Sequence, residues 1–402
     1  MTKIFPRNKY LNKIKPFIGQ EIIKVILGQR RTGKSYFLRQ VAEFISHDHK
    51  QTQIIYIDKE RYDFADIKTA DDLVKYVQAK KESDSLAVFI DEVQEIKDFE
   101  LAVRDFFSRG YDLYIAGSNS SLLAGELATS LSGRYVTITI YPLTYSEFVE
   151  FHGLRSDSDS LNKYLEFGGM PYLQRIGLQR EVVREYLLNL YNTIVLKDIV
   201  NRYQLKNIDL LNHLTYFLAD NIGSTVSANS ITKFLKSQKL QVNHNIILNY
   251  LEYMCQAFLV GRVRRYDLKG KRYLEVQEKY YFTDIGLRNF LVEFKPADIG
   301  KLLENVVYMH LIANGYDVSI GKLYEAEIDF IARQGEKRMY IQVAYLLADQ
   351  TTIDREFGNL LKIKDAYPKF VVTLDPIKFP DYQGVKHFQL KDFLLQLDSE
   401  KL

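Results

Sequence analysis

The sequence lacks tryptophan, has one cysteine, and contains no apolar run long enough to cross a membrane. A single cysteine, Cys255, cannot build an internal disulfide framework or a cysteine zinc cluster, and its apolar helical surroundings predict a core thiol. A bilayer-spanning helix needs about 20 consecutive apolar residues. The N-terminal residues also lack the apolar core of a secretion signal. We therefore expect a cytoplasmic protein with no membrane partner.

An excess of charge of one sign is absent as well. The chain has 54 Lys and Arg against 51 Asp and Glu, a net charge of +3. Any basic surface for nucleic acid must therefore be local. The 402 residues, 47% of them hydrophobic, predict a globular chain of about two to four domains.

Short apolar runs alternate with helical patterns in the first part of the chain. The expected strands are 22–27, 54–57, 86–90, 113–116 and 135–141, and the expected helices are 8–18, one starting at Lys34, 70–83, 95–108 and 120–131. Short buried strands that alternate with helices are typical of an α/β fold, a parallel sheet with helices on both faces. We assign this first domain to residues 1–150.

The pattern changes after Pro142. Helical periodicity predicts a helical lid or linker over 151–206, and three helices followed by a hairpin predict a winged helix over 207–290. A helix and four strands near 316–320, 327–333, 338–345 and 369–374 predict a second α/β unit over 291–402.

A phosphate-binding loop follows the first strand. Gly28-Gln-Arg-Arg-Thr-Gly33-Lys34-Ser35 has the spacing G-x-x-x-x-G-K-[ST] between a strand and a helix. Backbone N–H groups of such a loop surround phosphates, the lysine reaches the terminal phosphates, and the serine hydroxyl binds Mg²⁺. The expected ATP-binding residues are Gly28, Arg31, Thr32, Gly33, Lys34 and Ser35.

Two carboxylates end the third expected strand. Asp91 fits the outer-shell contact to Mg²⁺, and Glu92 fits the base that polarises the attacking water. An acidic pair that only caps the next segment is the alternative, but the preceding phosphate loop favours the catalytic interpretation.

Small polar residues end the fourth expected strand, which should neighbour the strand of Asp91. Asn119, or Ser118 in its place, could bind the attacking water or the terminal phosphate. Asn119 could equally cap the helix expected from Ser120, and both roles are compatible.

Arg134 precedes the fifth expected strand. An arginine there could reach the nucleotide of a neighbouring subunit and neutralise charge in the transition state. The alternative is a solvated surface charge.

With these motifs, the sequence resembles a large bacterial and archaeal family of AAA+ ATPases, related to archaeal and STAND-type signalling ATPases, whose C-terminal domain of unknown function looks like a restriction endonuclease. The matching segments are 28–35, 89–94, 116–123, 131–134, 141–148, 167–171, 196–202, 279–288, 303–307 and 327–330. The resemblance implies an oligomeric ATPase that uses ATP and Mg²⁺ to switch assembly or partner binding, with a protein or DNA as partner. It also implies that Pro171, in Gly168-Gly-Met-Pro171, contacts the nucleotide base.

The hairpin expected near 261–276 is basic. Its cations are Arg262, Arg264, Arg265, Lys269, Lys271 and Arg272, with Asp267 opposing them. A basic wing beside a helix-turn-helix could contact DNA phosphates, in repair or mobile-element biology. A structural lid or a protein-docking module is the alternative.

The C-terminal unit departs from the pattern of the endonucleases that it resembles. Asp329 and the helical Glu304 match that pattern, but Gln342 replaces a carboxylate and Ala344 replaces the lysine. An amide cannot offset a divalent cation and alanine offers no donor, so we expect no nuclease activity. The open alternative is that Glu325, Glu327 or Glu356 has taken over the missing carboxylate role.

Overall fold

The computed structural model describes residues 5–123, 131, 133–240, 242–293 and 298–402. The chain forms two compact units, Met1–Tyr141 with Gln256–Phe258, and Pro142–Cys255 with Leu259–Leu402. Among the helices within the described ranges, none is both long enough and apolar enough to span a bilayer.

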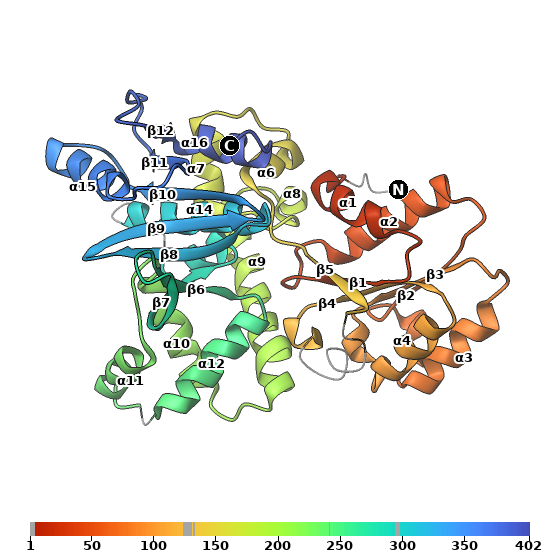
Figure 1. Cartoon of the computed structure of the whole chain (residues 1–402). Helices are drawn as coiled ribbons and strands as arrows, with labels where there is room; N and C mark the ends of the chain where they lie inside the picture. The colour runs from red at the N-terminus through yellow and green to blue at the C-terminus, as the bar shows by residue number, and fades with distance from the viewer. Residues whose placement is uncertain (1–4, 124–130, 132, 241, 294–297) are drawn as a thin grey trace. The chain divides into compact units, whose positions relative to one another are not determined.

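A five-stranded parallel sheet forms the centre of the first unit (Figure 1), and its strand order is β2-β3-β4-β1-β5. The strands are β1 Ile23–Leu27, β2 Gln53–Asp58, β3 Leu86–Asp91, β4 Asp112–Gly117 and β5 Tyr135–Thr139. The helices are α1 Asn8–Ile14, α2 Lys34–Asp48, α3 Ala70–Lys80 and α4 Phe99–Ser108, with short 3₁₀ turns η1 Lys15–Phe17, η2 Tyr62–Phe64, η3 Val93–Glu95 and η4 Ser120–Leu123. The predicted α/β fold is confirmed. Most of the helix expected over 120–131 lies outside the described residues.

Helices cover both faces of this sheet because its strands are apolar on both sides. Residues of α1 and α2 pack on one face and residues of α3 and α4 on the other, as Figure 1 shows. Alternate residues of one strand supply the two cores, for example Val25 to the α3–α4 side and Ile26 to the α1–α2 side.

One ion pair is buried inside the sheet. Lys24 on β1 is 0% exposed, and its ammonium contacts Asp112 on β4 and donates to the Gln20 carbonyl at 3.1 Å. Burial lowers the pKa of Lys24, and Asp112 opposes that shift. The Tyr114 hydroxyl donates to the second oxygen of Asp112 at 2.8 Å. Asp112 therefore compensates a cation that would otherwise be stranded between two central strands.

The second unit begins with helices. They are α6 Tyr145–His152, α7 Ser158–Phe167, α8 Leu173–Ile176, α9 Arg180–Thr193, the π-helix η5 Ile194–Asn201, α10 Ile208–Asp220, α11 Ala228–Ser237, α12 His244–Gln256 and α13 Ile285–Val292. Side chains cap two of these helices at their N-termini: Ser227 accepts from the Ser230 N–H at 3.1 Å and Asn243 from the Ile246 N–H at 2.9 Å. Cys255 on α12 is only partly buried, although burial raises its pKa to about 12.

A mixed seven-stranded sheet follows, in the order β12-β11-β10-β9-β8-β6-β7. Its strands are β6 Val260–Asp267, β7 Arg272–Phe282, β8 Asp317–Leu323, β9 Ala326–Gln334, β10 Lys337–Val343, β11 Lys369–Thr373 and β12 Val385–Gln389. The helices α14 Ile299–Ala313, α15 Gln350–Leu361 and α16 Leu390–Asp398 complete the unit.

The three helices and the hairpin expected for a winged helix are present, but the winged helix itself is not confirmed. Arg265–Asp267 of β6 pair in parallel with Ile320–Lys322 of β8, so the hairpin belongs to the seven-stranded sheet. Periodicity identifies the hairpin, but it carries no information about this pairing with a strand more than 50 residues away. The hairpin therefore shares its sheet with the C-terminal strands, and the domain boundaries after residue 150 remain predictions.

We predict that Asp112→Ala lowers the free energy of unfolding by about 3 kcal/mol, because it leaves the Lys24 ammonium buried without a counter-charge. Urea unfolding measures the change. Asp105→Ala is the matched control, since Asp105 pairs with Arg109 at 2.8 Å on the surface of α4 and should cost less than about 1 kcal/mol. Equal losses in the two variants would contradict the role given to Asp112.

Candidate nucleotide site and a buried charge cluster

The phosphate loop has the backbone geometry that its glycines allow. Gly28 has φ 148°, and a Cβ there would lie 2.2 Å from the Ile140 carbonyl oxygen. Gly33 has φ 100° and immediately precedes α2. Arg31 also has a positive φ of 68°, a conformation that the motif does not predict for a non-glycine residue. The sharp return of the chain between β1 and α2 thus depends on Gly28, where no side chain fits.

Lys34 lies over the loop that precedes it. Its side chain is buried, and its Nζ donates to the carbonyl oxygens of Gly28 and Gln29 at 3.1 Å each. The Thr32 hydroxyl also donates to the Gln29 carbonyl, at 2.9 Å. These bonds hold the ammonium at the mouth of the loop, where it can meet the terminal phosphates of a nucleotide.

Arg7 supports the loop from outside, and the motifs did not reveal it. Its guanidinium donates to the Thr32 carbonyl at 3.3 Å and to the Tyr141 carbonyl at 3.1 Å, and its backbone N–H donates to the Gln40 side chain at 3.0 Å. Arg7 is 5% exposed. Because Arg7 is 25 residues from Thr32 in the sequence, only the fold reveals this contact.

Three acidic side chains meet at the carboxyl ends of β2 and β3. The register pairs Asp58 with Asp91, and Glu92 follows. Asp58 contacts Arg39 of α2 at 3.0 Å. Sequence reasoning missed Asp58, although an aspartate directly after the apolar run 54–57 is the same signal that identified Asp91. Parallel strands align these carboxylates at the edge that carries the phosphate loop.

Asp91 is 1% exposed, and its Oδ2 has no hydrogen-bond partner among the described residues. Burial raises the pKa of the Asp91 carboxyl to about 6; Glu92 and Asp58 add to the shift, while Ser35 and Lys34 oppose it. A buried carboxylate oxygen without a protein donor, beside a serine hydroxyl, fits an oxygen-coordinated cation such as Mg²⁺.

Glu92 lies between two donors. Its Oε1 is 3.8 Å from Lys34 Nζ, and its Oε2 accepts a hydrogen bond from the Gln94 side chain. Glu92 has φ 53° and ψ 50°, a left-handed conformation, at the turn from β3 into η3. The structure therefore brings the predicted base next to the predicted phosphate-binding lysine.

Asn119 caps the turn that follows β4. Its Oδ1 accepts from the Ser121 N–H at 2.8 Å, and both Asn119 and Ser118 are 0% exposed. The strand β4 neighbours β3, as expected. The capping role is therefore seen, and the role at the attacking water stays a prediction.

Arg134 lies at the amino-terminal end of the strands, opposite the end that carries the phosphate loop. Its carbonyl accepts from the Ile23 N–H at 2.9 Å, so roughly 13 Å of β1 separates it from the phosphate loop. Its exposed side chain lies over the Phe107 ring at 5.6 Å. Arg134 is thus placed away from the phosphate loop of its own chain, and its role toward a neighbouring subunit stays a prediction.

The turn before Pro171 is fixed by contacts within the second unit. A Cβ on Gly168 would lie 2.5 Å from Asp284 Oδ1, and one on Gly169 would lie 2.3 Å from the Leu143 carbonyl oxygen. The Gly169 N–H donates to Asp284 at 2.8 Å. These glycines therefore have a packing role, while the contact of Pro171 with a nucleotide base stays a prediction.

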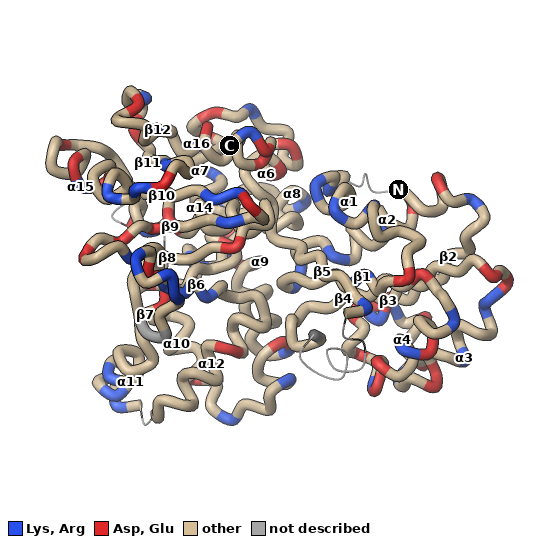
Figure 2. Tube along the Cα trace, in the orientation of Figure 1, with Lys and Arg blue, Asp and Glu red and all other residues tan. Residues whose placement is uncertain are grey.

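Acidic partners reduce the charge of the basic hairpin. Arg262 lies 3.4 Å from Glu252 and 4.0 Å from Glu278, and Arg264 lies 3.8 Å from Glu278. Arg265 bonds the Gln277 side chain. Figure 2 shows basic and acidic segments close together around β6 and β7. The six cations therefore present less positive charge than their number suggests.

A buried ionic cluster includes Glu304 and Asp329, the two residues that match the endonuclease pattern. Lys279 of β7, 3% exposed, lies 3.1 Å from Glu304, 2.9 Å from Glu327 and 4.0 Å from Asp329. The Tyr281 hydroxyl donates to Glu304 at 2.9 Å. An ammonium from β7, which the sequence did not suggest, therefore lies among carboxylates from α14 and β9.

The cluster has more carboxylates than cations. Burial raises the pKa of Asp329 and of Glu304; the charge of Glu304 adds to the shift at Asp329, and the charge of Glu327 adds to the shift at Glu304. Burial alone would lower the pKa of Lys279, but Glu304, Asp329 and Glu327 raise it above its usual value. Lys279 is therefore a permanent cation here, and it holds the carboxylates together.

The other candidates of this unit are less suited to bind a cation. Glu325 is exposed beside the β8–β9 turn, Glu356 is bound by Arg355 at 2.6 Å, and Gln342 is buried with an unpartnered Oε1. Within the described part of the chain, no group of three acidic, histidine or cysteine residues is arranged to hold a metal ion. Ala344 is buried as well.

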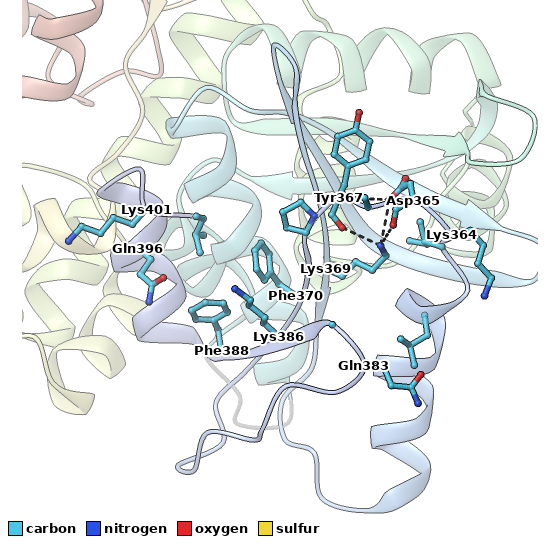
Figure 3. Close-up of a pocket in the computed structure, with 16 residues that line it drawn as sticks. Lys364, Asp365, Tyr367, Lys369, Phe370, Gln383, Lys386, Phe388, Gln396 and Lys401 are labelled. Atoms are coloured by element: carbon cyan, nitrogen blue, oxygen red, sulfur yellow. Dashed lines mark hydrogen bonds and ion pairs between the residues drawn. The ribbon is translucent and has the colours of Figure 1, made fainter.

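A pocket of about 610 Å³ lies beside β11 and β12 (Figure 3). Lys364, Lys386 and Lys401 line it together with Phe370 and Phe388. A fourth lysine, Lys369, is held by the carbonyls of Asp365 and Tyr367 at 2.6 and 3.2 Å. None of the lining residues belongs to the phosphate loop or to the Lys279 cluster, so the pocket is separate from both.

The parallel sheet, the loop after β1 and the acidic end of β3 define a P-loop nucleotide-binding domain. In agreement, residues 20–149 match the family described as an AAA domain, and residues 158–298 match a domain of unknown function, DUF8612.

Two uncharacterized proteins are similar along nearly the whole chain. One, from Haemophilus influenzae, is 36% identical over 97% of this chain and 98% of its own length. The other, MJ1544 from Methanocaldococcus jannaschii, is 31% identical over 85% of this chain and 79% of its own length. The chain belongs to the family of these two proteins.

Solved structures show only a distant likeness. The Aeropyrum pernix ORC1 protein in complex with DNA is 13% identical, with a TM-score of 0.34, over 72% of this chain and 93% of that chain. DnaA bound to AMPPCP and single-stranded DNA is 14% identical, with a TM-score of 0.32, over 62% and 89%.

We predict that Asp91→Asn makes the nucleotide-free protein less sensitive to pH. The native pKa of about 6 exceeds the ordinary aspartate value of 3.8, so the native state binds the proton more tightly and the wild type loses stability as pH rises from about 4 to 6. Above pH 7 the variant should be more stable, by up to about 3 kcal/mol. Urea unfolding at pH 4.5 and 7.5 without Mg²⁺ measures this. Asp84→Asn, on the surface, is the control, and an equal pH slope in wild type and Asp91→Asn would contradict the prediction.

We predict that Lys279→Met lowers the free energy of unfolding at pH 7.5 by about 3–5 kcal/mol, because the clustered carboxylates lose their cation. The loss should shrink as the pH is lowered, because burial raises the pKa of Glu304 and of Asp329 and their protonation removes negative charge from around Lys279. Thermal and urea unfolding measure it, with Lys269→Met in the hairpin turn as the control. A loss below about 1 kcal/mol at pH 7.5 would contradict the assigned role.

Proposed function

We propose that the first unit binds ATP with Mg²⁺ and hydrolyses it, and that the cycle switches assembly or partner binding. The observation that carries this proposal is the convergence of Lys34, Asp91 and Glu92 at the end of one parallel sheet. Its support is the 3.8 Å separation of Lys34 from Glu92 and the buried, unpartnered oxygen of Asp91.

Each residue has a distinct role in this proposal. Lys34 binds the terminal phosphates and offsets the charge that develops there. Glu92 accepts a proton from the attacking water, which must lie within hydrogen-bond distance of its carboxylate. Ser35 and Asp91 would hold Mg²⁺, which supplies positive charge to the phosphates when it is bound. Asn119 would orient the water, Arg134 would act on a neighbouring subunit's nucleotide, and Pro171 would contact the base.

DNA binding by the hairpin is the second candidate, with ATP controlling a DNA-bound state. Its support is the local group of six cations, but the pairing of Arg262 and Arg264 with Glu252 and Glu278 argues against a strong phosphate contact. In the C-terminal unit, the Lys279 ammonium competes with any metal ion for the same carboxylates. This supports the proposal that the unit does not cleave nucleic acid.

We predict that Glu92→Gln lowers the turnover of ATP by at least about a hundredfold while ATP still binds, because the amide cannot accept the proton. Lys34→Ala should weaken ATP binding itself, by about tenfold or more, since a charge-assisted contact is lost. Phosphate release and binding of a fluorescent ATP analogue measure the two effects, each with and without DNA.

If the wild-type protein turns over ATP no faster than the Glu92→Gln variant, the proposed hydrolysis is overturned. Stimulation of the wild type by DNA, lost in Arg264→Ala with Arg265→Ala, would favour the second candidate.

A further inference from the structure

Gln94 contacts the predicted base, although the sequence motifs gave it no role. It lies in η3, the 3₁₀ turn after β3. Its Nε2 donates to Glu92 Oε2, while Lys34 lies 3.8 Å from Glu92 Oε1. The two oxygens of the Glu92 carboxylate therefore face two different donors, an amide and an ammonium.

The oxygen atom of the Gln94 amide packs against β4. Its Oε1 is buried and has no hydrogen-bond partner among the described residues. A Cβ on Gly117, at the end of β4, would lie 2.8 Å from this oxygen. The amide thus packs against the bare backbone of β4, and this contact limits the rotation of the side chain that binds Glu92.

An amide donor can position the Glu92 carboxylate without adding a second positive charge, which a lysine would bring. If the Glu92 carboxylate formed a close ion pair with Lys34, it would point at the phosphate-binding ammonium instead of at a water molecule. A neutral donor holds the carboxylate in place through a hydrogen bond. It adds no charge that competes with Lys34.

We propose that Gln94 is a positioning residue for ATP hydrolysis, which holds the Glu92 carboxylate apart from Lys34 and aims it at the attacking water. The inference rests on the proposed ATPase function. It assigns to Gln94 no contact with nucleotide, and therefore predicts an effect on turnover without an equal effect on binding.

The test compares Gln94→Glu and Gln94→Ala with the wild-type protein. Gln94→Glu keeps the size of the side chain and removes the donor, and Gln94→Ala removes the whole contact. In both, kcat should fall by about tenfold to a hundredfold, the range for a hydrogen bond to a charged group. The Kd for ATP should stay within about twofold.

The split between kcat and Kd supplies a readout that a merely structural role would not give, because a general disturbance of the site would weaken ATP binding as well. Glu95→Ala, in the same turn but exposed, is the control and should leave kcat unchanged. Thermal unfolding of each variant checks that the fold is kept.

The outcomes separate the two proposals. If the wild-type protein shows no more turnover than Glu92→Gln, hydrolysis itself fails. If the wild type hydrolyses ATP and Gln94→Glu matches it in kcat, the role of Gln94 is overturned while the function stands. Losses of equal size in ATP binding and in kcat would also overturn it, since they would show a general disturbance of the site.

Discussion

The common direction of five parallel strands is the constraint on which the nucleotide site depends. Since β1 and β3 end at the same edge, the loop after Leu27 and the carboxylates of Asp91 and Glu92 meet there without any long loop to bring them together. The same geometry places Arg134 at the amino-terminal ends of the strands, next to Ile23. The sheet therefore separates Arg134 from the phosphate loop and the carboxylates of its own chain.

Both units contain a lysine buried among the strands of a sheet. Lys24 has one carboxylate, Asp112, and Lys279 lies among three, so the first cation is balanced and the second is outnumbered. A buried charge that lacks its partner is costly, whereas a well-formed pair adds little net stability. These lysines therefore link elements that are far apart in the sequence, β1 to β4 in the first unit and β7 to α14 and β9 in the second.

The sequence predicted the features that depend on short contiguous segments of the chain. The loop from Gly28 to Ser35 and the pair Asp91-Glu92 each lie in one motif, so spacing alone identifies them, and the apolar runs located all five strands of the first sheet. Arg7 and Lys279 escaped because their partners are 25 or more residues away. Asp58 escaped for a different reason, since its signal was present but had no motif to interpret it.

The seven-stranded sheet extends beyond the matched domain of unknown function, which ends at residue 298. Its hairpin, β6 and β7, lies inside that segment, and the strand that pairs with β6, β8, lies beyond it. Cutting the chain at 298 would expose the backbone edge of β6 and remove Glu304, Glu327 and Asp329 from around Lys279. The matched segment is therefore shorter than the stretch of chain that completes this sheet.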